Sequence, residues 1–517
     1  MGGDWLNLGQ VLEPNAKNYR TTVALKDRNR KFTYPELNSR VNKLAQGFLA
    51  TGLRKGDKLA VLLENCIEIV EVYLAAAKTG LVVVPVNFRL VASEIEYILN
   101  HSDSKGLIVH EEFIPAIETV KPKLKNIEED KYFVVGKNSY YGYLNYEELL
   151  KKSPDKKPEA EVSSKDPWIL LYTSGTTGVP KGVVRSHKSY IAFYLINSAD
   201  FGFNEHDVCL NVLPLCHVNS TFFSFTFTYI GATVYIHPAR SFNPVEILEL
   251  IDKEKVTFIS LIPTHYSLIL NVPKNIAEKY DTSSLRKLLC SSAPVLQETK
   301  KAIMNFFPGV ELYEGYGSTE AGIVTVLKPQ DQLRKLGSIG RESLGTDLIK
   351  ILDENGNEVG VGEVGELYSK GPMMFDEYYK DPDRTKSSFR GEWFSAGDLV
   401  KKDEDGFFYI VDRKDNMIIT GGEKVYPSEV EQVIAQHKKV FEVAVIGVPD
   451  EKWGEAVKAI VVLKDNETAS EQEIIEFCRG KIAGYKKPKS VDFIKSNDMP
   501  RSVTGKILYR ELRKRYR

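Results

Sequence analysis

The stretch LYTSGTTGVPKG, residues 171–182, concentrates residue types that suit phosphate binding. Its three glycines allow tight turns and a close approach of the backbone to a ligand, because they lack a Cβ atom. Its hydroxyls and backbone N–H groups can donate hydrogen bonds to phosphate oxygens, and Lys181 adds a positive charge. The Walker pattern GxxxxGK[ST] is absent. Because the stretch follows the apolar run WILLY, we predict a phosphate-binding loop between a strand and a helix.

Further short blocks of polar, charged and glycine residues follow along the chain. They are PLCHVN (214–219), SSAP (291–294), YGSTE (316–320), WFSAGD (393–398), DRKDN (412–416), GGEKVYP (421–427) and RSVTGK (501–506). Together with the 171–182 loop, this ordered series resembles the signature motifs of the adenylate-forming superfamily. That superfamily includes acyl-CoA synthetases, aryl-CoA ligases, peptide-synthetase adenylation domains and firefly-type luciferases. The resemblance implies an AMP-forming acid–CoA ligase that uses ATP, Mg²⁺ and coenzyme A.

The implied reaction joins a carboxylate to the α-phosphate of ATP and then transfers the acyl group to coenzyme A. Two anions must approach, so preorganised cations and N–H dipoles are needed. By resemblance, Glu320 is the magnesium ligand, Thr319 contacts the α-phosphate, and Lys506 bridges the carboxylate and the α-phosphate. His217 lies between the acyl and phosphate sites as a gate; a carboxylate is ionised at neutral pH and needs no general base. These four residues are the predicted catalytic residues.

The resemblance also implies the nucleotide site. Tyr316 offers a flat face to the adenine, while Asp398 accepts hydrogen bonds from the ribose hydroxyls and Arg413 donates to the same ribose. The predicted ATP-binding residues are Thr173, Ser174, Gly175, Thr176, Thr177, Lys181, Ser291, Ser292, Ala293, Tyr316, Asp398 and Arg413.

The last hundred residues carry the features that the resemblance assigns to coenzyme A. Trp453 packs on the cofactor, and Gly421 and Gly422 let the thin pantetheine arm pass because no Cβ atom blocks its path. The lysines that would hold the phosphates of coenzyme A are Lys487 and Lys489. Lys506 is expected to act in adenylation, whereas the residues assigned to coenzyme A act in the transfer to its thiol. We therefore expect the small domain to rotate between these two steps about a hinge at Asp415.

The acyl pocket is predicted from His217, Val218, Gly315 and Gly317. Acetate-activating relatives carry Trp at the position of Gly317, so the resemblance implies room for a larger acid. Residues 219–229, NSTFFSFTFTY, are rich in Phe and carry no charge. We favour a medium- or long-chain fatty acid. The alternatives are an aryl acid of the benzoate or cinnamate type, a carnitine-type CoA ligase, a luciferase-like oxygenase and a non-catalytic nucleotide-binding scaffold.

Alternating helical and extended patterns must position these residues. Such an order near the N-terminus predicts a parallel sheet with helices on its faces. The expected elements are helices over 34–52 and 67–80 and strands over 57–65 and 81–87. A polar, Pro-containing linker at 151–167 precedes a second α/β run, a glycine-rich β unit and a final α/β module.

The predicted fold class is therefore α/β. A large N-terminal domain of two α/β sheet subdomains and a small β-rich subdomain precedes a small mobile α/β C-terminal domain. The predicted boundaries are 1–412 for the first domain, 413–416 for the hinge and 417–517 for the second domain.

The amino-acid composition limits the classes of binding partner and the cellular setting that we expect. Of 517 residues, 69 are Lys or Arg and 70 are Asp or Glu, so the net charge of −1 gives no argument for nucleic-acid binding. Five scattered cysteines without CxxC spacing speak against a disulfide framework or a thiolate zinc site. We find no signal peptide and no apolar run of about 18 residues. We expect a cytoplasmic protein without an integral membrane segment, and the sequence leaves a homodimer open.

Overall fold

The chain is described by a computed structural model that covers residues 7–173, 180–238, 240–291, 295, 297–501 and 507–516. Some predicted site residues lie outside these ranges, namely Ser174, Gly175, Thr176, Thr177, Ser292, Ala293 and Lys506.

An eight-stranded sheet is built mainly from the first third of the chain. Its order is β19-β9-β8-β4-β3-β5-β6-β7. The strands from β8 to β7 run parallel, whereas β9 and β19 add antiparallel at one edge. The bounds are β3 Lys58–Leu62, β4 Val82–Pro85, β5 Ser104–His110, β6 Tyr132–Val135, β7 Leu144–Asn145, β8 Pro167–Thr173, β9 Lys181–Ser186 and β19 Glu377–Tyr378.

The two helices predicted near the N-terminus are confirmed. Helix α2 spans Tyr34–Ala50 and begins with a capping box in which Glu36 accepts a hydrogen bond from the Thr33 N–H. Helix α3 spans Ile67–Thr79 and ends at Gly80, which has a left-handed φ of 74°. Every residue of α3 is buried, because the helix lies inside the molecule.

A nine-stranded sheet forms the second layer, with the order β16-β15-β14-β13-β12-β10-β11-β1-β2. Its centre is parallel, and β2, β15 and β16 pair antiparallel near its edges. The bounds are β1 Val23–Lys26, β2 Lys31–Thr33, β10 Val208–Asn211, β11 Thr233–Ile236, β12 Phe258–Leu261, β13 Lys287–Ser291, β14 Glu311–Ser318, β15 Gly322–Leu327 and β16 Arg341–Glu342.

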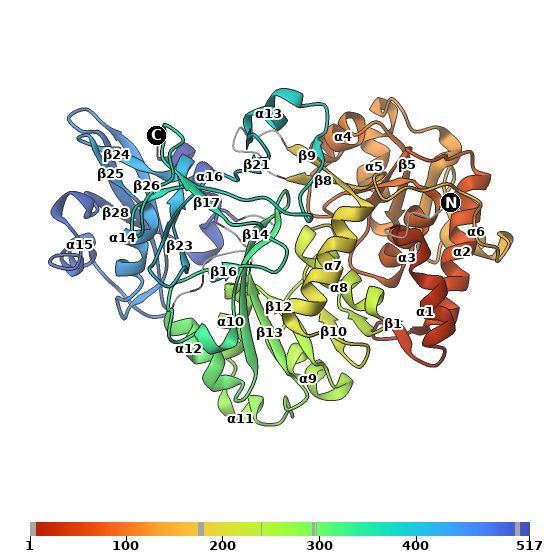
Figure 1. Ribbon diagram of the computed structural model, residues 1–517, viewed down its shortest axis with the longest axis horizontal. Coiled ribbons are helices and arrows are strands. Elements are labelled where there is room, and N and C mark those ends of the chain that lie inside the picture. Colours follow the sequence, from red (N-terminus) through yellow and green to blue (C-terminus); the bar gives the residue numbers. More distant parts are fainter. Residues whose placement is uncertain are drawn as a thin grey trace.

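Helices α7 (His187–Phe201) and α8 (Val218–Ile230) join the two sheets into one body. Figure 1 shows both helices between the strands at the right of the view and the green strands β12 and β13. The largest apolar cluster contains side chains from both sheets and from α3, α7 and α8. The two α/β sheets therefore share a hydrophobic core.

A small β unit and a C-terminal module complete the chain. The small unit is an antiparallel sheet of β17 (Lys350–Leu352), β18 (Gly365–Tyr368), β22 (Asp398–Lys402) and β23 (Phe408–Arg413). The module has its own apolar clusters and appears in blue at the left of Figure 1. Its elements are β24 Ile418–Thr420, β25 Glu423–Val425, α14 Pro427–Ile434, β26 Val440–Asp450, β27 Gly454–Leu463, α15 Glu471–Phe477, β28 Ser490–Phe493 and α16 Tyr509–Arg515.

The prediction that the 171–182 loop leads into a helix is wrong. Strand β9 follows the loop and pairs antiparallel with β8, from Thr173 opposite Lys181 to Pro167 opposite Ser186. Helix α7 begins only after this hairpin. The β-branched residues Val183 and Val184 favour the extended chain and are buried in the sheet.

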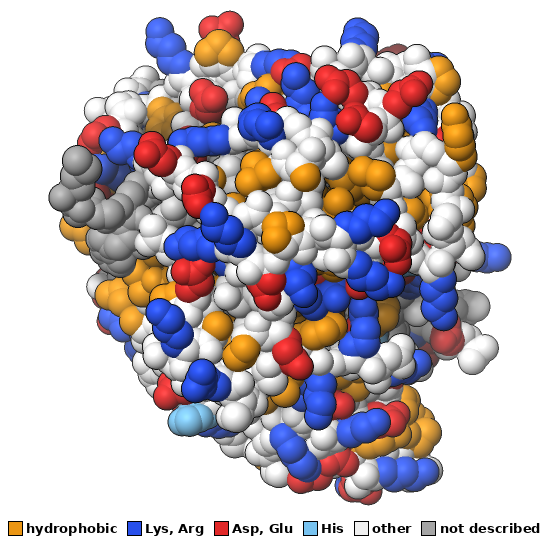
Figure 2. Space-filling view, turned by 90° about the vertical axis from the view of Figure 1, so that its right-hand side faces the viewer, with side chains coloured by type: hydrophobic (Ala, Val, Ile, Leu, Met, Phe, Trp, Pro, Cys, Tyr) orange, Lys and Arg blue, Asp and Glu red, His pale blue; other side chains and the backbone are white. Residues whose placement is uncertain are grey.

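The surface mixes charges of both signs. Figure 2 shows acidic and basic side chains close together on the face that carries the N-terminal helices. Exposed pairs of this kind typically contribute about 0–1 kcal/mol each. Within the described ranges, no helix has both the length and the apolar character that crossing a bilayer requires.

Candidate active site

Lys181, Glu320 and Tyr378 meet at the base of the predicted phosphate loop. Lys181 begins β9, Glu320 lies in the turn between β14 and β15, and Tyr378 belongs to β19. The Lys181 Nζ atom lies 2.7 Å from Glu320 Oε1 and donates to the Tyr378 hydroxyl at 2.8 Å. The Tyr378 hydroxyl donates to Glu320 Oε1 at 2.9 Å. The fold thus closes a three-membered polar cluster around the Glu320 carboxylate.

The Glu320 side chain is an ionised carboxylate at neutral pH. Burial acts to raise its pKa, but the charge of Lys181 and the hydrogen bonds from Lys181 and Tyr378 outweigh it and hold the pKa below its ordinary value. Burial and the nearby Glu320 raise the pKa of Tyr378, so this hydroxyl stays protonated and donates. Glu320 is only 6% exposed. A buried anion is therefore held in place by a cation on the strand that leaves the phosphate loop.

Thr173 lies directly opposite Lys181 where the hairpin opens. Its hydroxyl is buried and has no hydrogen-bond partner among the described residues. A buried hydroxyl without a partner is costly, and a ligand oxygen would satisfy it. This position fits the predicted contact with a phosphate group.

Tyr316, Asp398 and Arg413 form a second polar cluster. The Tyr316 hydroxyl donates to Asp398 Oδ2 at 2.6 Å, and Arg413 Nε lies 2.8 Å from Asp398 Oδ1. Burial and Asp398 raise the pKa of Tyr316. Asp398 is buried, and its carboxylate keeps further lone pairs that can accept hydrogen bonds. The structure brings together three residues that sequence analysis assigned to the adenosine.

Arg185 and Tyr378 are site residues that sequence analysis missed. Arg185 lies on β9 and donates through Nη1 to the carbonyl oxygens of Thr319 at 2.7 Å and Glu320 at 3.4 Å, and through Nη2 to that of Met373. A charged residue that directly follows two valines was a signal that could have revealed it. Tyr378 carried no comparable signal, because its role arises from strand pairing alone.

His217 and Val218 lie at the N-terminus of α8, after the segment that follows β10. His217 precedes the first turn of α8 and its carbonyl accepts from the Thr221 N–H, while Val218 is the first helical residue. Two positions on, Asn219 donates to the Ser291 hydroxyl at 2.7 Å and accepts from Ser260 at 3.1 Å. Sequence analysis did not assign Asn219. This chain of amide and hydroxyls links α8 to the sheet at the predicted acyl pocket.

Gly317 stays a predicted acyl-pocket residue, but a side chain at this position would require the backbone to move. A Cβ atom at Gly317 would lie 1.9 Å from the Gly322 carbonyl oxygen, so it would meet the backbone of β15. Gly317 permits the irregular pairing of β14 with β15. At Gly315, by contrast, the nearest atoms to a Cβ would be the Leu289 Cδ1 at 3.5 Å and the Ile323 Cδ1 at 3.7 Å. A Cβ atom at Gly315 would therefore make ordinary van der Waals contacts with two apolar side chains.

Gly421, Gly422 and Trp453 lie together in the C-terminal module. The Gly421 N–H donates to the Trp453 carbonyl at 2.8 Å, and a Cβ atom at Gly421 would lie 2.7 Å from the indole ring. Both glycines have positive φ, and Trp453 is 43% exposed. Lys487 and Lys489 belong to a different segment, which leads into β28. The structure therefore groups three of the five residues predicted for coenzyme A.

The predicted hinge lies in the segment that connects β23 to β24. Asp415 lies there in a short 3-10 turn, Lys414–Asn416. Arg513 of α16 donates to the Asp415 carbonyl and to Asn416 Oδ1, each at 2.8 Å. Across the junction, the Ser428 N–H of α14 donates to Asp412 at 3.0 Å. These contacts hold the C-terminal module against β23 in the orientation seen here.

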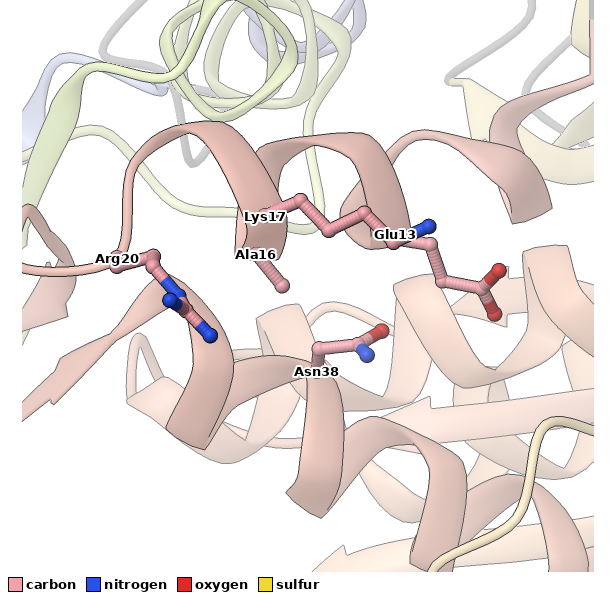
Figure 3. Close-up of a pocket in the computed structure, with 5 residues that line it drawn as sticks. All are labelled: Glu13, Ala16, Lys17, Arg20 and Asn38. Carbon is pink, nitrogen blue, oxygen red and sulfur yellow. The ribbon is translucent and has the colours of Figure 1, made fainter.

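A surface pocket of about 300 Å³ lies between α1 (Leu12–Asn18) and α2 (Figure 3). Its lining residues are Glu13, Ala16, Lys17, Arg20 and Asn38, none of which belongs to the predicted site. Beside it, the buried Lys78 Nζ donates to Asn38 and Asn42 at 2.6 Å, and burial lowers the pKa of Lys78 to about 8. We assign this pocket no part in the reaction.

With this geometry in view, comparison with known proteins gives the family. The sequence matches the model of the AMP-binding enzyme over residues 12–379 and that of the AMP-binding enzyme C-terminal domain over residues 429–506. The chain belongs to the AMP-binding enzyme family of adenylate-forming proteins. Within it, this protein is an AMP-forming acyl-CoA synthetase that uses ATP and coenzyme A.

Relatives of several substrate classes are similar over nearly the full length. The long-chain-fatty-acid–CoA ligase FadD13 of Mycobacterium tuberculosis is 36% identical, covering 94% of this chain and 93% of its own. A feruloyl-CoA synthase of Amycolatopsis is 35% identical, covering 99% of both chains. The solved anthranilate CoA ligase AuaEII with anthranoyl-AMP has a TM-score of 0.90 at 30% identity, covering 99% of this chain and 97% of its own.

Proposed function

We propose that this acid–CoA ligase activates a medium- or long-chain fatty acid. The observation that carries the proposal is the apolar surrounding of Gly315, where the nearest side-chain atoms are methyl groups of Leu289 and Ile323. An alkyl chain placed there would be removed from water, at about 0.8 kcal/mol for each buried methylene. The similarity to FadD13, whose name states a long-chain fatty acid, supports the same substrate class.

An aryl acid of the benzoate or cinnamate type is the second candidate. The hydrogen-bonded chain of Ser260, Asn219 and Ser291 favours it, because an amide between two buried hydroxyls can recognise a polar substituent on an aryl ring. The similarity to the feruloyl-CoA synthase supports this alternative.

The chemistry proceeds in two steps. A carboxylate oxygen attacks the α-phosphorus of ATP, the bond between the α- and β-phosphates breaks, and pyrophosphate leaves. The thiolate of coenzyme A then attacks the acyl carbon and AMP leaves. In the first step, Thr173, Lys181 and Thr319 bind phosphate oxygens, and Lys506 bridges the carboxylate and the α-phosphate. His217 gates the acyl site.

Magnesium fits the Glu320 position. No group of three or more His, Cys, Asp or Glu residues that could hold a metal occurs in the described part of the chain. Mg²⁺ is often held by one or two carboxylates together with substrate phosphates and water, and the ionised Glu320 is a carboxylate of this kind. When bound, the ion would neutralise charge on the phosphates. The Lys181 ammonium has three N–H donors, so it could contact a phosphate oxygen as well as Glu320.

The nucleoside and coenzyme A occupy the other two clusters. Tyr316 stacks on the adenine, with Ser291, Ser292 and Ala293 on its other side, and Asp398 and Arg413 bind the ribose. Ser174, Gly175, Thr176 and Thr177 complete the phosphate loop. Coenzyme A binds at Gly421, Gly422, Trp453, Lys487 and Lys489.

The acid is identified by a panel of substrates. Straight-chain acids from C2 to C18, benzoate and cinnamate are each incubated with ATP, Mg²⁺ and the protein, and AMP release is measured with and without coenzyme A. We expect the highest kcat/KM among the medium and long alkyl chains. A preference for the aryl acids would select the second candidate, and a preference for acetate would refute both.

A further inference from the structure

Arg185 is a buried cation that the assigned roles do not explain. Its relative exposure is 0%, and the rings of Tyr190 and Phe222 lie 5.1 and 4.9 Å from its guanidinium carbon. Burial lowers its pKa, which expresses the cost of placing this charge in the interior. Throughout the described ranges, no carboxylate lies within ion-pair distance of it. A costly buried charge without a carboxylate partner must be retained for its other contacts.

Those contacts are backbone carbonyls of the active-site turn. Nη1 donates to the Thr319 oxygen at 2.7 Å and to the Glu320 oxygen at 3.4 Å. Nη2 donates to the carbonyl of Met373, which packs against the same turn. The Phe375 N–H also donates to the Glu320 oxygen, at 2.7 Å. Because the guanidinium is a planar fork, it sets the direction of several carbonyls at once.

The direction of the Thr319 carbonyl determines where the next N–H points. In a trans peptide the C=O and N–H point to opposite sides, so the Glu320 N–H points away from Arg185. That N–H is one of the groups that stabilise the Glu320 carboxylate. Lys181, on the same strand as Arg185, holds the carboxylate itself. Strand β9 therefore fixes both the backbone and the side chain of Glu320.

We propose that Arg185 is a positioning residue for the adenylation step, which holds the Glu320 carboxylate in register with the metal and phosphates through the Thr319 and Glu320 carbonyls. The inference rests on the proposed role of Glu320. Lysine at this position keeps the charge, but a single ammonium cannot reproduce the planar fork.

The test is the ATP–pyrophosphate exchange of Arg185→Lys, measured across a magnesium titration. A displacement of about 1 Å at a reacting centre can cost on the order of 100-fold in rate. We expect a kcat loss of that order, a nearly unchanged KM for the acid and a higher magnesium concentration for half-maximal rate. A variant that loses stability but keeps the wild-type kcat and magnesium response overturns the proposal.

A matched control and a double variant distinguish a positioning role of Arg185 from a general loss of folding stability. Tyr190→Phe keeps the ring over the guanidinium and loses only the 3.1 Å contact with Thr221, so it should lower Tm without changing the magnesium response. Glu320→Gln should shift the magnesium response, and adding Arg185→Lys to it should slow the rate little further. If the two losses multiply, Arg185 does not act through Glu320. If Glu320→Gln responds as wild type, the proposed metal role fails and the inference falls with it.

Gly322→Ala tests the same idea should Arg185→Lys fail to fold. Gly322 has a φ of 78°, and its added Cβ would lie 2.7 Å from the Met373 Cβ, so the turn that carries Thr319 and Glu320 must move away from Met373, the third partner of Arg185. The expected result is again a lower kcat with a raised magnesium requirement. A normal magnesium response in folded Gly322→Ala overturns the proposal.

Discussion

Replacing Lys181 with Met should give the enzyme a new acid limb in its pH–rate profile. In the wild type, burial alone would raise the pKa of Glu320, and Lys181 at 2.7 Å is the main reason that the pKa is lowered instead. Methionine keeps much of the shape of the lysine side chain and removes the charge. The carboxylate then keeps the hydrogen bonds from Tyr378 and from its own N–H, and its pKa should rise above the ordinary value because burial is no longer opposed by a charge.

The size of the change follows from the burial of the pair. The side chains of Lys181 and Glu320 are 22% and 8% exposed, so solvent screens them only in part. Removing one partner of a buried pair costs about 3–5 kcal/mol, and the exposure of Lys181 favours the lower end. We therefore expect the acid limb of Lys181→Met to lie at a higher pH than that of the wild type.

The folding stability of Lys181→Met should also depend on pH in a way that reports the pKa of Glu320. In the wild type the pKa of Glu320 is lower in the folded state than in the unfolded state. The ionised carboxylate therefore stabilises the fold at pH values above the unfolded-state pKa, and this stabilisation is lost as the pH falls through the folded-state pKa. In Lys181→Met the raised pKa reverses the trend, so the Tm deficit should be larger at pH 8.5 than at pH 5.5.

The assay is ATP–pyrophosphate exchange from pH 5.5 to 9, with Lys181→Arg as the charge-preserving control. If the Lys181→Met profile has the shape of the wild-type profile and its Tm deficit is independent of pH, Lys181 does not control the ionisation of Glu320.

Three further predictions follow from other parts of the molecule. Asp415→Pro should keep ATP–pyrophosphate exchange and lose acyl-CoA formation, whereas Lys506→Ala should lose the exchange yet convert a supplied acyl-adenylate; loss of the same half-reaction in both contradicts domain alternation. Gly315→Val should lower kcat/KM for the longest acids most, by about fourfold per methylene excluded, and an unchanged chain-length profile in the acid panel refutes the pocket. Glu431 of α14 accepts from the Val445 N–H and the Tyr509 hydroxyl, and burial raises its pKa to about 8. The folded C-terminal module should therefore lose up to about 4 kcal/mol between pH 5 and pH 9, and Glu431→Gln should flatten this dependence in denaturant titrations; equal slopes would show that Glu431 is not the group responsible.

Sequence patterns accounted for elements whose stability is local. Helices α2 and α3 were predicted because the apolar periodicity and the glycine at the end of each helix lie within or next to the segment itself. The resemblance to a family likewise rested on short motifs in a fixed order. Each motif is recognised from its own residues, without knowledge of its tertiary contacts. The cluster of Tyr316, Asp398 and Arg413 was anticipated in this way, since all three residues stand in such blocks.

What the sequence by itself determined was therefore helices α2 and α3, the order of the motifs and the class of chemistry. Only the tertiary structure decided which groups face one another. Lys181 reaches Tyr378, 197 positions away, because β19 adds to the edge of the sheet beside β9. The contacts of Arg185 and the collision that a side chain at Gly317 would cause depend equally on how β9, β14 and β15 are placed. Strand order and register arise from packing between distant segments, and a local pattern of residues therefore does not predict them.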